Sequence, residues 1–123
     1  MAMLAMAVPI LPGQTERWRR FVGELEGGRR EAYRAHRRRL GLRERVFFQA
    51  TPHGDLVTLV LEGDDPAAAF AAFGAGDDDF TRWFVQEVQA VHGFDLRQPP
   101  PGALPEQVVD SQPAAPGDAA PPA

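Results

Sequence analysis

The 123-residue chain contains no cysteine and no lysine. Without cysteine, neither disulfide bonds nor thiolate chemistry is available, and this fits a reducing compartment, so we expect a cytoplasmic location. All thirteen basic side chains are arginines, seventeen residues are acidic, and the net charge is −4. A nucleic-acid-binding protein typically shows a basic domain or a basic stripe with exposed aromatic residues. We therefore expect no nucleic-acid partner.

Long apolar runs are also absent. Residues 1–10 are apolar, but this run has no basic flank and is shorter than the roughly 20 residues of a membrane helix. It predicts a strand, and we expect no membrane association. The length leaves room for one domain, which we place at residues 1–110. Residues 111–123 are rich in alanine and proline, so we expect a disordered tail there.

The first half of the chain begins with a strand pattern and continues with a helix pattern. Residues 2–8 predict an apolar strand. Residues 14–40 predict a long helix with one apolar stripe opposite an arginine-rich face. Gly27 and Gly28 lie in its middle, where each costs about 1 kcal/mol relative to alanine. We expect a kink or a close backbone approach at these glycines.

A hairpin and further helices follow. Residues 45–51 and 56–61 are rich in β-branched and aromatic side chains and are joined by turn residues. Helical patterns resume after Asp65, a predicted N-cap, and end at Gly93. Residues 104–109 are the remaining candidate for a fourth strand. The order βαββαβ predicts an α+β, ferredoxin-like fold with a four-stranded antiparallel sheet and helices on one face.

The hairpin is apolar on both of its faces. Phe47 neighbours Phe48, and the second strand carries Leu56, Val57, Leu59, Val60 and Leu61. Leaving such side chains in water forfeits roughly 1.5–3 kcal/mol each. Because helices cover only one face, a second copy of the sheet is the simplest cover for the other face. We therefore expect a homodimer that forms through the sheet.

A family resemblance rests on several segments. Trp83-Phe84 is followed by His92-Gly93-Phe94-Asp95-Leu96, three prolines with a glycine at 99–102, and Leu-Pro-Glu at 104–106. With Leu-Pro-Gly at 11–13, these residues resemble the dimeric α+β barrel superfamily, and more closely a small uncharacterised bacterial family within it. The likeness covers residues 1–110. Antibiotic-biosynthesis monooxygenases, polyketide cyclases, ring-cleavage isomerases and some haem-binding enzymes belong to the superfamily, and many use no cofactor.

His92 is the first candidate for chemistry. It follows Phe84 and Val88 on the apolar face of its helix and precedes the capping Gly93. The helix dipole there favours the protonated imidazole and burial favours the neutral one, so its pKa can lie near neutrality. The alternative is a histidine that only closes the helix through a terminal carbonyl.

Tyr33 and His36 form the second candidate site. They are three residues apart on the stripe of the first helix, so both point toward the sheet. Such a pair can bind or polarise a carbonyl or enol oxygen. The alternative is an amphipathic rim whose polar tips reach water.

The expected substrate-binding residues surround these catalytic candidates: Trp18, Trp83, Phe84, Gln49, Thr58 and Asp95. Gln49 and Thr58 either line a cavity or face solvent, and Asp95 either orients His92 or fixes a turn. The three histidines are isolated in the sequence, so we expect no metal site. We expect no cofactor, although haem held by a single histidine stays open as an alternative.

The arginines between residues 29 and 45 have two interpretations. They form either a solvated face with ion pairs to nearby glutamates, including Glu44, or a rim that draws an anionic substrate toward the cavity. Together, the residues and the resemblance predict a homodimeric, cofactor-independent enzyme of cyclase, isomerase or monooxygenase type. Its substrate would be a small apolar oxygenated metabolite. The alternative is a non-catalytic module for small-molecule binding or dimerisation.

Overall fold

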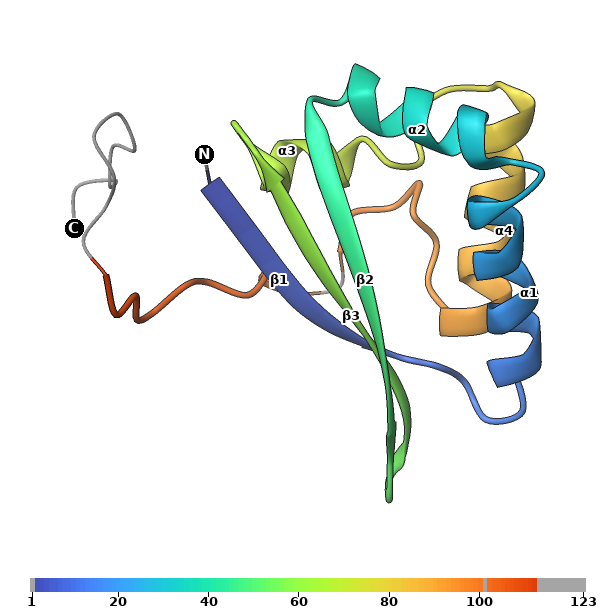
Figure 1. Ribbon diagram of the computed structural model, residues 1–123, viewed down its shortest axis with the longest axis horizontal. Coiled ribbons are helices and arrows are strands. Elements are labelled where there is room, and N and C mark those ends of the chain that lie inside the picture. Colours follow the sequence, from blue (N-terminus) through green and yellow to red (C-terminus); the bar gives the residue numbers. More distant parts are fainter. Residues whose placement is uncertain (1, 101, 113–123) are drawn as a thin grey trace.

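The computed structural model describes residues 2–100 and 102–112 and shows a mixed α+β fold (Figure 1). Strands β1 (Ala2–Pro9), β2 (Leu42–Thr51) and β3 (Gly54–Gly63) form an antiparallel sheet in the order β1-β3-β2. The helices are α1 (Thr15–Glu26), α2 (Arg30–Arg39), α3 (Pro66–Ala71) and α4 (Asp79–His92). Within the described residues, every helix is too short or too polar to cross a membrane.

The inner face of the sheet forms one wall of the core. Strand β1 alternates strictly, and its buried residues Leu4, Met6 and Val8 pair with Leu61, Leu59 and Val57 of β3. Helices α1 and α4 pack side by side and supply most of the opposite wall (Figure 1). Their buried side chains are Trp18, Phe21 and Leu25 of α1 and Phe80, Thr81, Phe84, Val88 and Val91 of α4. The two layers therefore enclose a core of aliphatic and aromatic side chains.

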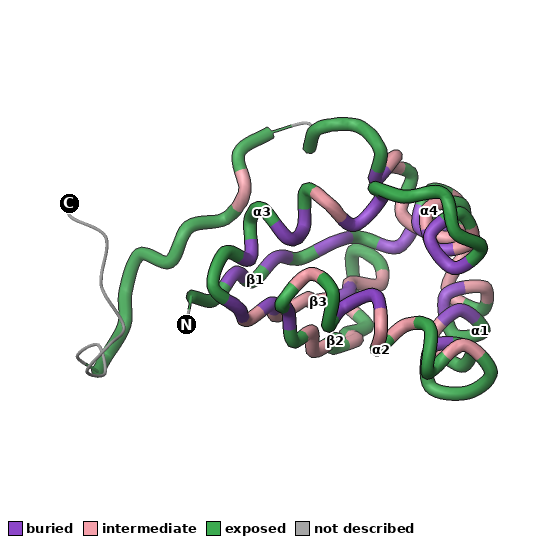
Figure 2. Tube along the Cα trace, turned by 90° about the horizontal axis from the view of Figure 1, so that it is seen from above, coloured by how far each residue is buried: buried purple, intermediate pink, exposed green. Residues whose placement is uncertain are grey.

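No helix of the described residues packs against the outer face of the sheet. Exposed and buried positions alternate along β1 in Figure 2, and Met3 on this face is 52 % exposed. Phe47 is 54 % exposed and pairs with Thr58, whereas Phe48 points to the inner face and stacks on Trp18. The hairpin is therefore apolar on both faces, as its sequence predicts.

The helix expected at residues 14–40 is broken into two. Helix α1 ends at Glu26 and α2 begins at Arg30, with Gly27 and Gly28 between them. A Cβ at residue 27 would lie 2.8 Å from the carbonyl oxygen of Gly23, so the chain can turn this tightly only with glycine there. The expected interruption of the helix is confirmed and is a complete break. It allows α2 to pack against the edge strand β2.

The caps at the other helix ends agree with the sequence. The Asp65 side chain accepts a hydrogen bond from the backbone N–H of Ala68, and Pro66 occupies the first turn of α3. Gly93 ends α4 in the left-handed conformation, with φ at 82°. These caps fix where α3 and α4 begin and end relative to the sheet.

The expected fourth strand is not shown, since the sheet of the described residues has three strands. Residues 104–109 run without strand structure, and Val108 and Val109 are 78 % and 80 % exposed. Pro105 has no N–H to donate, so this segment cannot form a complete ladder of backbone hydrogen bonds with a neighbouring strand of the same chain. Of the tail expected at 111–123, residues 113–123 lie outside the described part of the chain.

Candidate functional site

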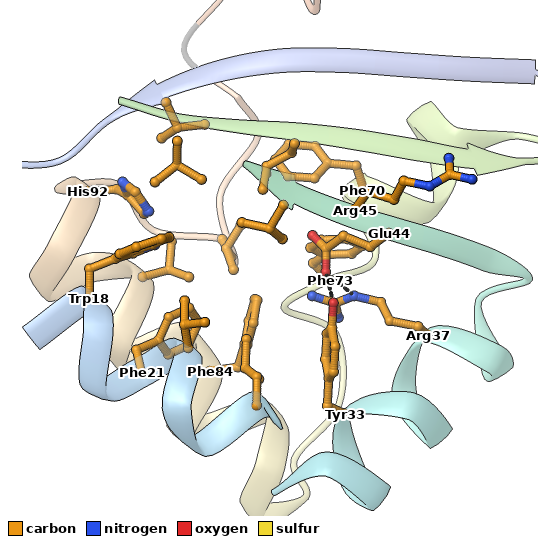
Figure 3. Close-up of a pocket in the computed structure, with 18 of the residues that line it drawn as sticks. Trp18, Phe21, Tyr33, Arg37, Glu44, Arg45, Phe70, Phe73, Phe84 and His92 are labelled. Atoms are coloured by element: carbon orange, nitrogen blue, oxygen red, sulfur yellow. Dashed lines mark hydrogen bonds and ion pairs between the residues drawn. The ribbon is translucent and has the colours of Figure 1, made fainter. Parts of the chain in front are cut away.

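A cavity of about 650 Å³ lies between the helices and the inner face of the sheet (Figure 3). Its size falls within the range of natural small-molecule sites. Aromatic and aliphatic side chains make up most of its wall, among them Val8, Trp18, Phe21, Val46, Phe48, Leu59, Phe73, Phe84 and Val88. A flat or branched apolar molecule fits such a lining.

One side of the cavity carries a hydrogen-bonded cluster of Tyr33, Arg37 and Glu44 (Figure 3). The Tyr33 hydroxyl donates to Oε1 of Glu44 at 2.6 Å, and Nε of Arg37 donates to the same oxygen at 3.0 Å. The side chains of Arg37 and Glu44 are only 5 % and 4 % exposed. Both donors reach Oε1, so among the described residues Oε2 receives no hydrogen bond. The cluster thus combines a buried charge pair with unused acceptor capacity.

The Arg37 guanidinium also has unused donor capacity. Its Nη1 lies 2.6 Å from Nδ1 of His36, and its plane packs 3.9 Å from the centre of the Phe73 ring. Its Nη2 is buried and has no hydrogen-bond partner among the described residues. A buried donor without a partner costs about 1–3 kcal/mol, so an acceptor that reached this atom would be stabilising.

His36 lies behind the cavity wall and not on it. The ring is 3 % exposed and packs among Phe73, Phe80 and Phe84. Arginine always donates, so Nδ1 of His36 accepts the bond from Arg37. Burial lowers the pKa of His36 to about 4, and the charges of Arg37 and Arg39 act in the same direction. His36 is therefore neutral at physiological pH and holds Arg37 in place.

Tyr33 lies on the cavity wall with its hydroxyl pointing at Glu44. Burial raises the pKa of Tyr33, the negative charge of Glu44 raises it further, and the positive charge of Arg37 opposes both effects. The hydroxyl therefore stays protonated over the physiological range. It acts as a fixed donor to the carboxylate and not as a base.

His92 lies on the other side of the cavity from Tyr33 and Arg37 (Figure 3). Its Nδ1 is 2.8 Å from the carbonyl oxygen of Pro9, and because a carbonyl only accepts, Nδ1 carries the proton. Nε2 is then the free acceptor. Burial lowers the pKa of His92, and the bond to Pro9 partly offsets this. The three residues predicted to be catalytic therefore do not converge on one point.

The residues expected to bind substrate are divided by the fold. Trp18 and Phe84 line the cavity, whereas Trp83 does not, because it packs against Phe21 under the guanidinium of Arg29. The parity of the strand pairing puts Gln49 and Thr58 on the outer face of the sheet. For both residues, the solvent-facing alternative fits this placement.

Asp95 belongs to a second hollow of about 640 Å³, which lies between β1 and the segments 92–100 and 102–105. Its side chain accepts a hydrogen bond from the backbone N–H of Arg97 at 2.9 Å, so it fixes a turn. The two hollows share Val8, Phe70, His92, Phe94 and Leu96. His92 therefore lies on the wall between them.

Sequence reasoning missed Arg37 and Glu44 as site residues. It treated Glu44 as one of several surface partners for the arginines of α2. The signal was present in the strand parity, because Glu44 shares its side of β2 with Val46 and Phe48, whose inner positions pair with Leu59 and Val57. Arg37 lies one helical turn after Tyr33 on the same face.

Comparison with known proteins found no matching family model, curated protein or solved structure. Across residues 2–100 and 102–112, no three histidine or acidic side chains are grouped in a way that could hold a metal ion. The chemistry of the site is therefore argued from the cavity and its polar cluster.

Proposed function

We propose that the protein is a small homodimeric enzyme that acts without a cofactor on a small, largely apolar oxygenated molecule held in the helix–sheet cavity. The buried cluster of Tyr33, Arg37 and Glu44 at the cavity wall carries this proposal. Burying an ion pair with spare donors and acceptors is costly, and perturbed polar groups in clefts concentrate at functional sites. The resemblance to cyclases, isomerases and monooxygenases of the dimeric α+β barrel superfamily supports the same class.

The cluster suits proton transfer next to a carbonyl group. A substrate carbonyl oxygen accepts from Nη2 of Arg37, and the Glu44 carboxylate takes a proton from the carbon beside that carbonyl. The electrons of the broken C–H bond form an enolate, whose oxygen is stabilised by the guanidinium. Return of the proton from Glu44 to another carbon completes an isomerisation. In a cyclisation, the enolate carbon attacks a second carbonyl carbon, the π electrons of that carbonyl move onto its oxygen, and this oxygen takes the proton from Glu44 to become a hydroxyl. Tyr33 keeps the carboxylate oriented through its hydrogen bond.

His92 supplies a second proton acceptor for a ligand that spans the cavity. Its Nε2 is neutral and its pKa is lowered by burial, so it accepts a proton without carrying a charge in the resting state. In the proposed reaction it handles the proton of a hydroxyl at the far end of the substrate.

The non-catalytic alternative has one observation in its favour. Tyr33 and Arg37 already donate hydrogen bonds to Glu44, and aromatic rings enclose His36. These polar groups therefore also attach α2 to the sheet. In this alternative the cavity binds an apolar molecule that leaves unchanged.

Deuterium exchange of a bicyclic ketone tests the proposal. Incubated with 2-tetralone in D₂O, the wild-type protein should accelerate exchange beside the carbonyl, followed by proton NMR. Glu44→Gln should still bind the ketone but lose roughly 100-fold or more of the acceleration, the usual contribution of a general base. Glu16→Gln, an exposed change on α1 away from the cavity, is the control. Binding without acceleration by the wild type would favour the binding module, and no binding would contradict both.

The homodimer and the complete ferredoxin-like sheet form part of the same proposal. The uncovered outer face presents Met3, Phe47, Leu56 and Val60, edged by the ion pair between Arg45 and Glu62. Covering it with a second copy removes this apolar surface from water. Among the described residues, strand β1 pairs with β3 along one edge and leaves its other edge free. The fourth strand lies at this edge in the superfamily that the chain resembles. We place residues 104–109 there in the assembled dimer.

A further inference from the structure

The mouth of the cavity is strongly basic. Five arginines line the cavity, and only two glutamates, Glu26 and Glu44, oppose them. Arg34 and Arg38 of α2 are exposed while lining the cavity, so they mark its opening to solvent. Arg43 also borders the cavity, but the strand pairing directs its side chain to the outer face of the sheet, as it does for Gln49. The chain as a whole has a net charge of −4, so this positive region is local.

Arg34 and Arg38 differ from Arg37 and Arg45 in their ion pairs. Arg37 pairs with Glu44, and Arg45 pairs with Glu62. Across the described residues, Arg34 and Arg38 have no carboxylate within ion-pair distance. Like charges gathered without partners repel one another and cost folding free energy. An anionic group at the mouth would remove that repulsion.

From this arrangement we infer that the ligand is an amphipathic acid, with an apolar ring system inside the cavity and a carboxylate held by Arg34 and Arg38 at the mouth. The inference rests on the proposed ligand site and names the substrate class for it. Guanidinium groups bind carboxylates through two parallel hydrogen bonds, and a basic mouth also steers an anion toward the opening. The inner carbonyl of the same molecule reaches Nη2 of Arg37.

The charge balance inside the cavity favours this orientation. Arg37 and Glu44 neutralise each other, so the buried part of the wall at this cluster carries no net positive charge for an acid. A carboxylate placed there would be desolvated without a counter-charge, which is costly. The acid therefore stays at the exposed arginines, and the apolar body enters first.

A matched pair of ligands tests the inference: a 2-tetralone that carries a ring carboxylate, and its methyl ester. Calorimetry at low ionic strength should show the acid binding about tenfold or more tightly than the ester, as expected when a charge-assisted contact is added. The advantage should shrink at 0.5 M NaCl, since exposed charges are screened over roughly a Debye length, about 10 Å at 0.1 M and less at higher salt.

Variants locate the acid. Arg34→Gln, Arg38→Gln and the double variant should lower acid affinity, by about tenfold for the double variant, and leave ester affinity unchanged. Arg30→Gln, an exposed change on the same helix but outside the cavity lining, should change neither. Equal binding of acid and ester, or an acid preference that survives these variants, would overturn the inference while leaving the ketone site intact. Failure of both ligands and of 2-tetralone would overturn the ligand site itself.

Discussion

Nε of Arg37 donates to Oε1 of Glu44 over 3.0 Å, and this contact joins the last turn of α2 to the start of β2 inside the protein. The two residues are seven positions apart, and the chain between them reverses at Gly41, whose φ is 65°. The left-handed turn brings the helix back over the strand edge. One local turn therefore creates both the polar cluster and one wall of the cavity.

Removing one member of this pair should be far more damaging than removing both. Glu44→Leu leaves the Arg37 charge buried without its partner and should lower the free energy of unfolding by about 3–5 kcal/mol. Adding Arg37→Met should restore a large part of that loss, because an apolar pair of similar volume buries no charge that would need a partner. Urea titration of both variants measures the difference.

Glu62→Gln at the exposed ion pair with Arg45 is the control. It should cost less than about 1 kcal/mol, since surface pairs contribute little. If the single and double variants at positions 37 and 44 were equally stable, the cluster would not be a coupled buried pair.

The stability of the protein should fall in mild acid because of His36. Its pKa is lowered to about 4 in the folded state from an ordinary value of 6.5, so the unfolded chain binds the proton first. Stability is full above pH 6.5 and is lost as the pH falls toward 4, by on the order of 3 kcal/mol in total. The lowered pKa of His92 acts in the same direction.

The variant His36→Gln isolates this effect. It keeps an acceptor for Arg37 but cannot titrate, so the free energy of unfolding should depend less steeply on pH between 6.5 and 4 than in the wild type. Urea midpoints at a series of pH values give the two slopes. Identical slopes would show that His36 does not carry the acid sensitivity.

The elements of the fold could be predicted because each has a strong local signal. The glycine pair marked the break between α1 and α2, Asp65 marked the start of α3, and Gly93 marked the end of α4. The fourth strand could not be established in this way. Residues 104–109 carry β-branched side chains, but pairing depends on a partner that local sequence does not reveal.

The site was predicted only in part. The spacing of residues along a helix shows which side chains share a face, but not whether side chains from different elements meet at one point. The spacing of Tyr33 and His36 placed both on the inner side of α2, yet aromatic rings enclose His36. The face on which Gln49 and Thr58 lie depends on the alternation of side chains along their strands. The sequence left this alternation open because both faces of the hairpin are apolar. Glu44 is buried because the same alternation puts it on the inner face. This could be recognised only once the pairing register of β2 and β3 was known.

Gly27 should be intolerant of any side chain. In Gly27→Ala the new Cβ would lie 2.8 Å from the backbone oxygen of Gly23, which can move only if α1 distorts, so we expect a loss of about 2 kcal/mol. Gly28→Ala is the matched control, because its nearest atom is a Glu24 side-chain oxygen at 3.5 Å. Thermal unfolding should separate the neighbouring variants, and equal melting temperatures would contradict the tight approach.

Phe47 should control assembly without affecting the fold of one chain. It is 54 % exposed on the outer face of the sheet, so Phe47→Glu removes no contact within the core. Across a two-fold interface the same change places two carboxylates in apolar surroundings, which opposes association. Sedimentation at micromolar concentration should give twice the chain mass for the wild type and the single chain mass for Phe47→Glu. Gln86→Glu, an exposed change on α4, should remain dimeric, and a monomeric wild type would rule out the proposed dimer.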